Sequence, residues 1–244
     1  MHIEAFIQAR MGSTRLPGKV LKRVLGKPLL DFLVERLAQS KEIDDIVVLT
    51  STQASDDLIA NFCQERGILC FRGSEEDVLD RYYQAALWRK PEGIVRITAD
   101  CPLIDPEIVD QVVQVFRKNN PHMDYVSNAL QRTFPRGLDV EVFSFQALQQ
   151  AFQLAIHPEE REHVTLYLYR HPERFHLKNV AHQPSLSHHR WTVDTSEDFA
   201  LIQLILENLY PSHPQFRLKD ILQLLAQHPQ WSELNSHIEQ KKLP

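Results

Sequence analysis

The sequence predicts an α/β fold, with a doubly wound and mostly parallel sheet and helices on both faces. Short apolar runs alternate with amphipathic stretches through the first half of the chain, in the order β-α-β-α-β-α-β. One of these runs, Ile46–Leu49, is continuously apolar, as strands buried on both faces of a sheet are. Strands that alternate with helices pair in parallel through right-handed crossovers, and this arrangement gives a doubly wound sheet.

Local signals place each element of the first half. Residues 3–7 form an apolar first strand, and the helix predicted over 29–37 repeats its apolar side chains on one face. Ser55, which two acids follow, is an expected N-cap, and Pro106 is expected in the first turn of a helix. Further strands are predicted at 46–49, 69–71 and 94–98, and further helices from Ser55 to Arg66, from Ser74 to Trp88 and from Pro106 to Phe116.

The second half has a different rhythm, and a turn-rich loop at 134–138 leads into its first strand. Thr195 and Asp198 have the spacing of a capping box at the start of a helix. The sequence has no internal repeat, low-complexity tract or convincing linker. The second half is therefore expected to extend the same sheet, with strands at 139–143, 175–180 and 190–193 and helices at 145–156, 161–169, 195–209 and 218–225.

The composition is that of a globular protein, because 43% of the 244 residues are hydrophobic and 24% are charged. A net charge of −5 excludes a generally basic surface for nucleic acid. The three cysteines form no CxxC pair, which favours a reducing compartment over a disulfide framework. No apolar run reaches the roughly 18 residues of a membrane span. We therefore expect a cytoplasmic enzyme without nucleic-acid or membrane partners.

The loop after the first strand, Arg10–Lys19, carries groups that bind phosphates. Three cations, two hydroxyls and two glycines follow the strand directly. Backbone N–H groups and positive charge at the end of a strand bind polyphosphates, so the loop indicates a nucleotide. It is not a P-loop, because five residues separate Gly12 from Gly18 and Val20 stands where Ser or Thr would bind Mg²⁺.

Two carboxylates, Asp100 and Asp194, each follow an apolar run that is predicted to be a strand. A carboxylate in that place needs a partner, and a divalent cation that bridges it to phosphates would supply one. Asp100 is therefore a candidate ligand of Mg²⁺, whereas Asp194 could be a ligand or a helix cap. Asp105, directly before Pro106, is better explained as an N-cap.

Side chains of the second half are candidates for binding a second substrate. Arg136 can form a fork with a carboxylate and so favours an acidic molecule, although a surface salt bridge explains it almost as well. Asp139, Glu162 and His163 are further candidates. The histidines at 182, 188 and 189 lack the spacing of a zinc site.

Several motifs together resemble the sugar cytidylyltransferases. Residues 7–19, which read IQARMGSTRLPGK, are similar to the opening motif of this family, which includes the CMP-Kdo and CMP-acylneuraminate synthetases. The similarity is greatest to the spore-coat polysaccharide SpsF-type branch and covers most of the chain. Its other motifs are FRGS at 71–74, DVLDRY at 77–82, DCPLIDP at 100–106, REHVT at 161–165 and RWTVDT at 190–195.

The resemblance implies a GT-A-like nucleotidyltransferase fold and Mg²⁺-dependent transfer of CMP from CTP to a sugar hydroxyl. Within a single domain spanning 1–244, residues 1 to about 120 would bind the nucleotide, and the remainder would bind the acceptor sugar and close the site. The family also suggests a homodimer. By the same resemblance, Arg10, Arg15 and Lys19 would contact the triphosphate as catalytic residues, Asp100 and Asp194 would hold Mg²⁺, and the nucleotide would lie near Gln8, Ala9, Gly12, Ser13, Thr50, Ser51, Arg72, Ser74, Asp77 and Asp100.

The expected mechanism is an in-line attack by an acceptor oxygen on the α-phosphorus of CTP, with pyrophosphate as the leaving group. The protein would mainly position the reactants and neutralise charge, and the sequence shows no obvious general base.

Three alternatives to this function stay open. The enzyme could use another nucleoside triphosphate, because no loop reads cytosine by its composition alone. A GT-A glycosyltransferase would normally carry an Asp-x-Asp motif, whereas Asp100-Cys101-Pro102 has one acid. A catalytically silent homologue would not need to keep its phosphate-binding cations.

Overall fold

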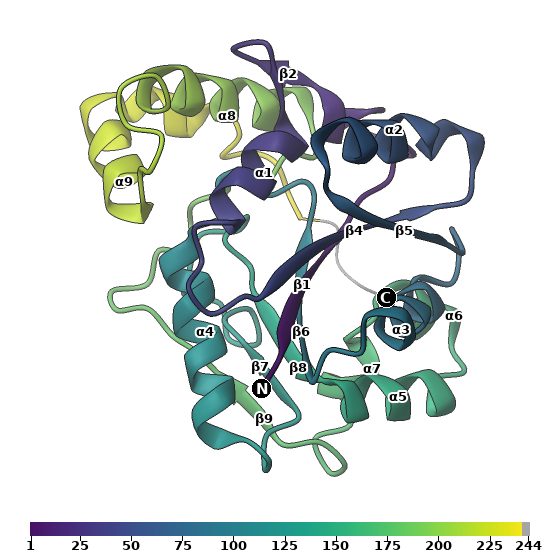
Figure 1. Ribbon diagram of the computed structural model, residues 1–244. Coiled ribbons are helices and arrows are strands. Elements are labelled where there is room, and N and C mark those ends of the chain that lie inside the picture. Colours follow the sequence, from purple (N-terminus) through teal and green to yellow (C-terminus); the bar gives the residue numbers. More distant parts are fainter. Residues whose placement is uncertain (241–244) are drawn as a thin grey trace.

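The computed structural model describes residues 1–240 of the chain. A seven-stranded sheet forms its centre, in the order β5-β4-β1-β6-β8-β7-β9 (Figure 1). Among these strands only β8 runs antiparallel to its neighbours, so the sheet is mostly parallel, as the sequence predicts. The strands are β1 (Ile3–Gln8), β4 (Asp45–Ser51), β5 (Leu69–Gly73), β6 (Gly93–Thr98), β7 (Tyr125–Ser127), β8 (Glu141–Ser144) and β9 (Leu177–Asn179).

Helices cover both faces of this sheet, as predicted (Figure 1). On one face lie α1 (Leu29–Leu37), α2 (Asp57–Arg66), α4 (Pro106–Asn119), α8 (Ser196–Leu209) and α9 (Leu218–Gln227). On the other face lie α3 (Val78–Arg89), α5 (Phe145–Leu154), α6 (Pro158–Glu162) and α7 (Leu166–Arg170). No helix within residues 1–240 is long and apolar enough to cross a membrane. The smaller elements are a ribbon of β2 (Arg23–Val24) and β3 (Lys27–Pro28) and the 3₁₀ turns η1 (Lys19–Leu21), η2 (Ala54–Asp56) and η3 (Pro229–Glu233).

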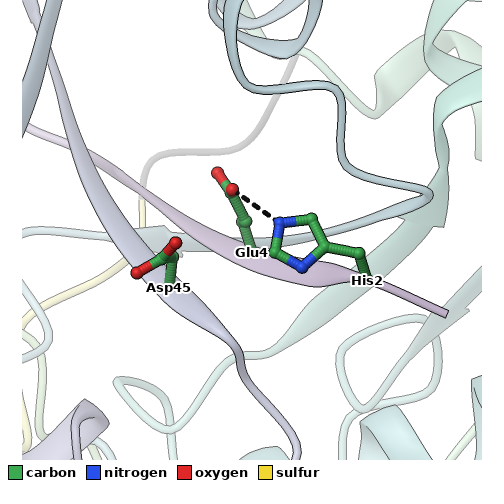
Figure 2. Close-up of side chains that lie close together, drawn as sticks. All are labelled: His2, Glu4 and Asp45. Atoms are coloured by element: carbon green, nitrogen blue, oxygen red, sulfur yellow. Dashed lines mark hydrogen bonds and ion pairs between the residues drawn. The ribbon is translucent and has the colours of Figure 1, made fainter.

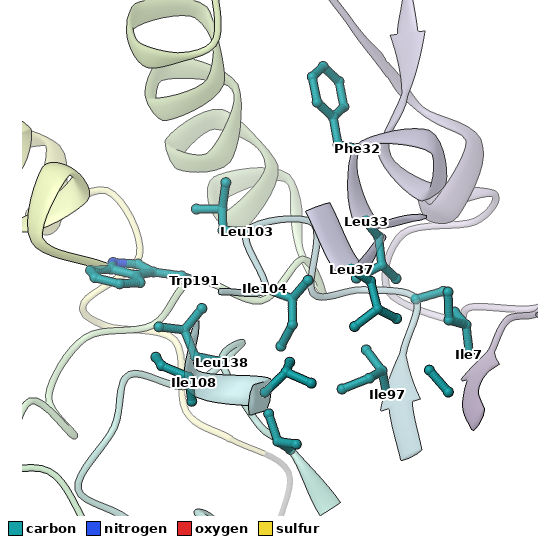
Figure 3. Close-up of a cluster of buried hydrophobic side chains, with 14 of the residues drawn as sticks. Ile7, Phe32, Leu33, Leu37, Ile97, Leu103, Ile104, Ile108, Leu138 and Trp191 are labelled. Carbon is teal, nitrogen blue, oxygen red and sulfur yellow. The ribbon is translucent and has the colours of Figure 1, made fainter. Parts of the chain in front are cut away.

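Each face of the sheet has its own apolar core. Along β1, Ala5 and Ile7 belong to one core and Phe6 to the other, which is the period of two that a strand imposes. Figure 3 shows the first core, where Leu37 of α1 lies close to Ile97 of β6 and Ile7 of β1. Burying one such side chain contributes about 1.5–3 kcal/mol to stability. The packing therefore fixes the ends of β1 and β6, from which the opening loop and the Asp100 loop emerge.

The strand predicted at 190–193 is wrong. A single bridge joins Arg190 to Arg136, and no ladder follows it. The N–H of Val193 donates instead to the carbonyl of Asp100 at 2.8 Å. The apolar residues of this run are buried by side-chain packing while their backbone bonds go to two different segments, so the run has the composition of a strand without its pairing.

Several predicted helix bounds also differ from the structure. The helix predicted from Ser74 begins at Val78, with Asp77 as its N-cap, and the helix predicted over 145–156 ends at Leu154. The helix expected over 161–169 is divided into α6 and α7, because Val164 between them adopts a positive φ of 26°. Ser55 is not an N-cap, since it lies inside η2 and α2 begins at Asp57. The carboxylate of Asp56, at the end of that turn, binds the loop after β1 instead. The capping box predicted at the start of α8 is confirmed.

Candidate active site

The loops that follow β1 and β6 meet at one edge of the sheet, because these parallel strands are neighbours. Together with the segment before α8 they border a cleft of about 660 Å³. Ala9 does not contribute to it, since its side chain is buried in the core. The predicted site residues that line the cleft are Gln8, Arg10, Gly12, Ser13, Arg15, Lys19, Asp100, Glu162, His163 and Asp194.

Lys19 lies between two carboxylates of this cleft. Its Nζ donates to Asp100 Oδ2 at 2.8 Å and to Asp194 Oδ1 at 2.7 Å. Burial disfavours the ammonium, but the two carboxylates outweigh this effect and raise the pKa of Lys19. Side chains that are 81 and 175 positions away in the sequence thus meet at one nitrogen atom.

The backbone of the opening loop determines where Lys19 lies. Gly18 adopts a φ of 67° directly before η1, a left-handed conformation that glycine tolerates and other residues rarely adopt. The N–H of Gly18 donates to the carbonyl of Met11 at 3.1 Å, which closes the loop on itself. The turn therefore returns the chain to the cleft at the position of Lys19.

Asp56 anchors the opening loop to the neighbouring strand. Its buried carboxylate accepts hydrogen bonds from the Met11 N–H at 2.7 Å, the Thr50 hydroxyl at 3.0 Å and the Ser51 N–H at 3.1 Å. Burial disfavours ionisation, but these hydrogen bonds outweigh it and lower the pKa of Asp56. Thr50 and Ser51, which are predicted to bind the nucleotide, are fully buried and do not line the cleft. The sequence gives no sign of this role for Asp56, because an acid beside Ser55 has the pattern of a helix start.

Arg72, Ser74 and Asp77, also predicted to bind the nucleotide, follow one another at the end of β5 and do not line the cleft. Arg72 Nε donates to the carbonyl of Ser51 at 2.9 Å. Ser74 accepts the N–H of Asp77 at 3.0 Å, and Asp77 caps α3 and pairs with Arg161 at 2.5 Å. For these three residues a contact with the nucleotide stays a prediction.

Asp194 is fixed by a network of charged side chains. Its Oδ2 pairs with Arg15 at 3.0 Å and with Arg190 at 2.9 Å. Burial disfavours ionisation, but Lys19, Arg15 and Arg190 outweigh it and lower the pKa of Asp194. Asp198 holds Arg190 in turn, and its carboxylate also accepts the N–H of Asp194 at 3.0 Å. Asp198, which belongs to the capping box of α8, therefore also supports the cleft through Arg190 and Asp194.

The candidate acceptor residues lie in three places. Glu162 and His163 line the cleft itself. Asp139 pairs with Arg132 in a separate pocket of about 320 Å³ that shares Thr98 with the cleft. Within residues 1–240 the guanidinium of Arg136 has no hydrogen bond or ion pair, and it lines a larger cavity of about 740 Å³.

Asp100 and Asp194 have the chemistry of a Mg²⁺ site that phosphates complete. Such sites usually hold the ion through one or two carboxylates together with substrate phosphates. Both carboxylates converge on one point, the Nζ of Lys19, and the Thr98 hydroxyl orients Asp100 by donating to its Oδ1 at 2.6 Å. The two residues therefore fit a divalent cation once Lys19 leaves the space between them.

A second cluster of potential metal ligands lies at the beginning of β1 and β4, where His2, Glu4 and Asp45 approach one another (Figure 2). The buried Glu4 carboxylate accepts from His2 Nε2 at 2.8 Å and from Arg89 Nε at 3.0 Å. The same arginine donates to Asp45 at 2.7 Å. Because Arg89 already pairs with both acids, this cluster is an ion-pair network that ties α3 to the amino ends of the strands.

Sequence comparisons connect the chain to known proteins. A family model described as cytidylyltransferase matches residues 5–242. The spore coat polysaccharide biosynthesis protein SpsF of Bacillus subtilis is 36% identical over 230 residues, which cover 91% of this chain and 93% of that protein. An uncharacterised protein of Methanocaldococcus jannaschii is 39% identical over 243 residues, which cover 99% of this chain and 97% of its own.

Solved structures agree with the sequence comparisons. A cytidylyltransferase from Leptospira borgpetersenii has a TM-score of 0.91 and 33% identity, with 99% of this chain and 100% of that chain covered. A CMP:2-keto-3-deoxy-manno-octonic acid synthetase complexed with CTP has a TM-score of 0.66 at 19% identity, with 86% and 100% covered, and shares the fold. The predicted nucleotidyltransferase fold is thereby confirmed. The chain belongs to the cytidylyltransferase family, and it is a nucleotidyltransferase.

Proposed function

We propose that this enzyme transfers CMP from CTP to a small acidic sugar, in a Mg²⁺-dependent reaction that releases pyrophosphate. The observation that carries the proposal is the contact of Lys19 with Asp100 and Asp194, because it places a mobile cation and two carboxylates in one cleft. The similarity to SpsF supports a role in bacterial surface polysaccharide biosynthesis, and the CTP complex of a structural neighbour supports CTP as the donor. We assign the reaction to the cytoplasm.

Substrate binding would exchange the ion pairs of the cleft. Without substrate, Lys19 neutralises Asp100, and Lys19 and Arg15 neutralise Asp194. With substrate, the two carboxylates would hold Mg²⁺, whose chemistry there is to neutralise the charge on phosphate oxygens. Lys19 and Arg15 would then pair with the phosphates of CTP, for which a flexible ammonium and a planar fork are suited.

In the reaction itself, the chain aligns the reactants and stabilises the leaving group. The acceptor hydroxyl attacks the α-phosphorus, the bond to the bridging oxygen of the β-phosphate breaks, and pyrophosphate leaves with the negative charge. Lys19 and Arg10 would stabilise that charge, and losing one such contact typically costs about 10²–10³ in rate. We assign the proton of the hydroxyl to a phosphate oxygen of the substrates.

Arg136 supports an acidic acceptor. The Arg136 N–H donates to the His189 carbonyl at 3.0 Å, and its own carbonyl accepts the Trp191 N–H at 2.7 Å, so the backbone of Arg136 is fixed. Burial lowers the pKa of its guanidinium, and a carboxylate bound to it would offset that cost. The residues that would contact the sugar hydroxyls are Asp139, Glu162 and His163.

An assay of pyrophosphate release tests the proposal. The purified enzyme and Mg²⁺ are incubated with each of the four nucleoside triphosphates and a panel of acidic and neutral sugars. We expect release only with CTP and an acidic sugar. Release with a different triphosphate identifies another nucleotidyltransferase. In a separate incubation with a nucleotide sugar and no triphosphate, consumption of the nucleotide sugar identifies a glycosyltransferase. A lack of release together with no CTP-induced rise in melting temperature rejects the proposal.

A further inference from the structure

The segment Asn235–Gln240 follows η3 and binds Arg190 and Asp198, the side chains that hold the carboxylate and the backbone of Asp194. We propose that Asn235 and Gln240 are positioning residues that fix Asp194 through Arg190, so that the catalytic cleft is complete only when this segment is in place. The inference rests on the proposed role of Asp194 and on contacts that the proposed function does not use.

Arg190 is the link between this segment and Asp194. Its Nε and one terminal nitrogen donate to the two oxygens of Asp198 at 2.8 and 3.0 Å. The same terminal nitrogen donates to Asp194 Oδ2 at 2.9 Å, and the other donates to Gln240 Oε1 at 2.6 Å. Because each of its three nitrogens has a partner, the planar guanidinium of Arg190 is held in one orientation. Because the side chain of Arg190 is only 9% exposed and that of Asp198 is fully buried, water does not substitute readily for Asp198.

Asn235 binds the same network at two points. Its side chain is 3% exposed, and its Nδ2 donates to the Arg190 carbonyl at 2.9 Å and to Asp198 Oδ1 at 2.8 Å. One amide thus holds both the backbone of Arg190 and the carboxylate that orients its guanidinium. Since Asp198 also accepts the backbone N–H of Asp194 at 3.0 Å, both ends of Asp194 depend on side chains that this segment positions.

Gln240 differs from Asn235 because it is exposed and borders two spaces. It lines the cleft that contains Lys19 and also the cavity of about 740 Å³ behind Arg190. An exposed hydrogen bond contributes little to stability, so the main effect of the Gln240 contact is on the orientation of Arg190. Removing a group that orients a metal-binding side chain typically costs about 10–100-fold in metal affinity or activity.

Kinetics of Asn235→Ala and Gln240→Ala test the proposal. We expect the Mg²⁺ concentration for half-maximal rate to rise about tenfold for Gln240→Ala and toward 100-fold for Asn235→Ala. The KM for CTP should change less than the Mg²⁺ dependence, because Asn235 and Gln240 bind Arg190 and Asp198 directly and reach the opening loop only through Asp194. Gln240→Glu should restore the Mg²⁺ dependence by retaining the acceptor. The matched controls are Ser236→Ala, whose hydroxyl donates to the Glu233 carbonyl, and Glu239→Ala, which changes an exposed side chain.

Crystal structures of the parent and both variants give a second readout that needs no activity. We expect the carboxylate of Asp194 to move by about 1 Å in the variants, a displacement that can reduce a rate by about 10². If Asp194 does not move in the variants, the proposed role of the segment is overturned. The same holds if folded variants keep the Mg²⁺ dependence of the parent. A parent that does not use CTP rejects the proposed function instead, and the positions of Asp194 then still decide whether the segment holds it.

Discussion

Replacing Lys19 with methionine should tighten divalent-cation binding in the cleft while it slows turnover. Methionine keeps much of the apolar stem but removes the ammonium from between Asp100 and Asp194. Their oxygens lie 2.8 and 2.7 Å from that nitrogen, hence about 5.5 Å apart at most, and two charges at that separation repel by about 3 kcal/mol at an effective dielectric constant of about 20. A divalent cation would relieve this repulsion in the variant, whereas in the parent it must first displace the ammonium.

The size of the effect follows from this repulsion. About 1.4 kcal/mol corresponds to a factor of ten in affinity, so 3 kcal/mol corresponds to about 100-fold. Arg15 and Arg190 still pair with Asp194 in the variant and weaken the repulsion, so we expect Mn²⁺ to bind about 10- to 100-fold more tightly. Turnover should fall by about 10²–10³, because the leaving group loses a charge contact.

The assay measures Mn²⁺ binding to the nucleotide-free enzyme by electron paramagnetic resonance, and pyrophosphate release on the same preparation. Arg15→Met is the matched control, since it also removes a cation from Asp194. The Arg15 side chain is 39% exposed, so its loss should change Mn²⁺ affinity by less than about threefold. An unchanged or weaker Mn²⁺ affinity in folded Lys19→Met would refute the exchange of ion pairs.

Three further changes test the acceptor site, the opening loop and the pH dependence of stability. Arg136→Ala should raise the KM for the acidic sugar by about 10–100-fold at an unchanged KM for CTP, because a charged hydrogen bond is worth about 1.5–3 kcal/mol, and equal KM values for the sugar contradict its role. Asp56→Ala leaves the Met11 N–H without its buried acceptor, so a urea titration should show a loss of roughly 2–3 kcal/mol together with weaker CTP binding. Burial of Glu141 disfavours its ionisation, but Arg96 and its other partners outweigh this and hold its pKa below the usual 4.5. The stability it contributes is therefore complete above about pH 4.5 and is lost as the pH falls through the lowered pKa, and urea titrations of Glu141→Gln should show a weaker loss of stability over that acid range.

Elements with strong local patterns could be predicted from the sequence. α1 has the predicted bounds, because its apolar residues repeat on one face. The start of α8 was predictable, since a capping box is encoded within four residues. The three-residue strand β7 and the two-residue strand β2 are too short to show a repeat of apolar residues in the sequence. The pairing of β7 also depends on the distant strands β8 and β9. The run at 190–193 wrongly predicts a strand. Its apolar side chains are buried, as in a strand, but its backbone does not form a ladder with a neighbouring strand.

The candidate site could be predicted only in part. The meeting of Lys19 and Asp100 follows from the rule that loops after neighbouring parallel strands share an edge. The sequence could not decide whether Asp194 is a ligand or a cap, and the structure shows that Asp198 accepts the N–H groups at the start of α8. Asn235 has no local signal at all, because its contact with Arg190 spans 45 positions.

The contact between Lys19 and Asp194 also has a consequence for synthesis of the chain. Ribosomes add about 5–20 residues per second, so the 175 positions between these residues take roughly 10–35 s to make. During that interval the nascent chain carries the cationic loop without its second carboxylate. The nascent chain therefore carries the cationic loop long before it carries Asp194, so a product that terminates between them would hold Lys19 without this partner.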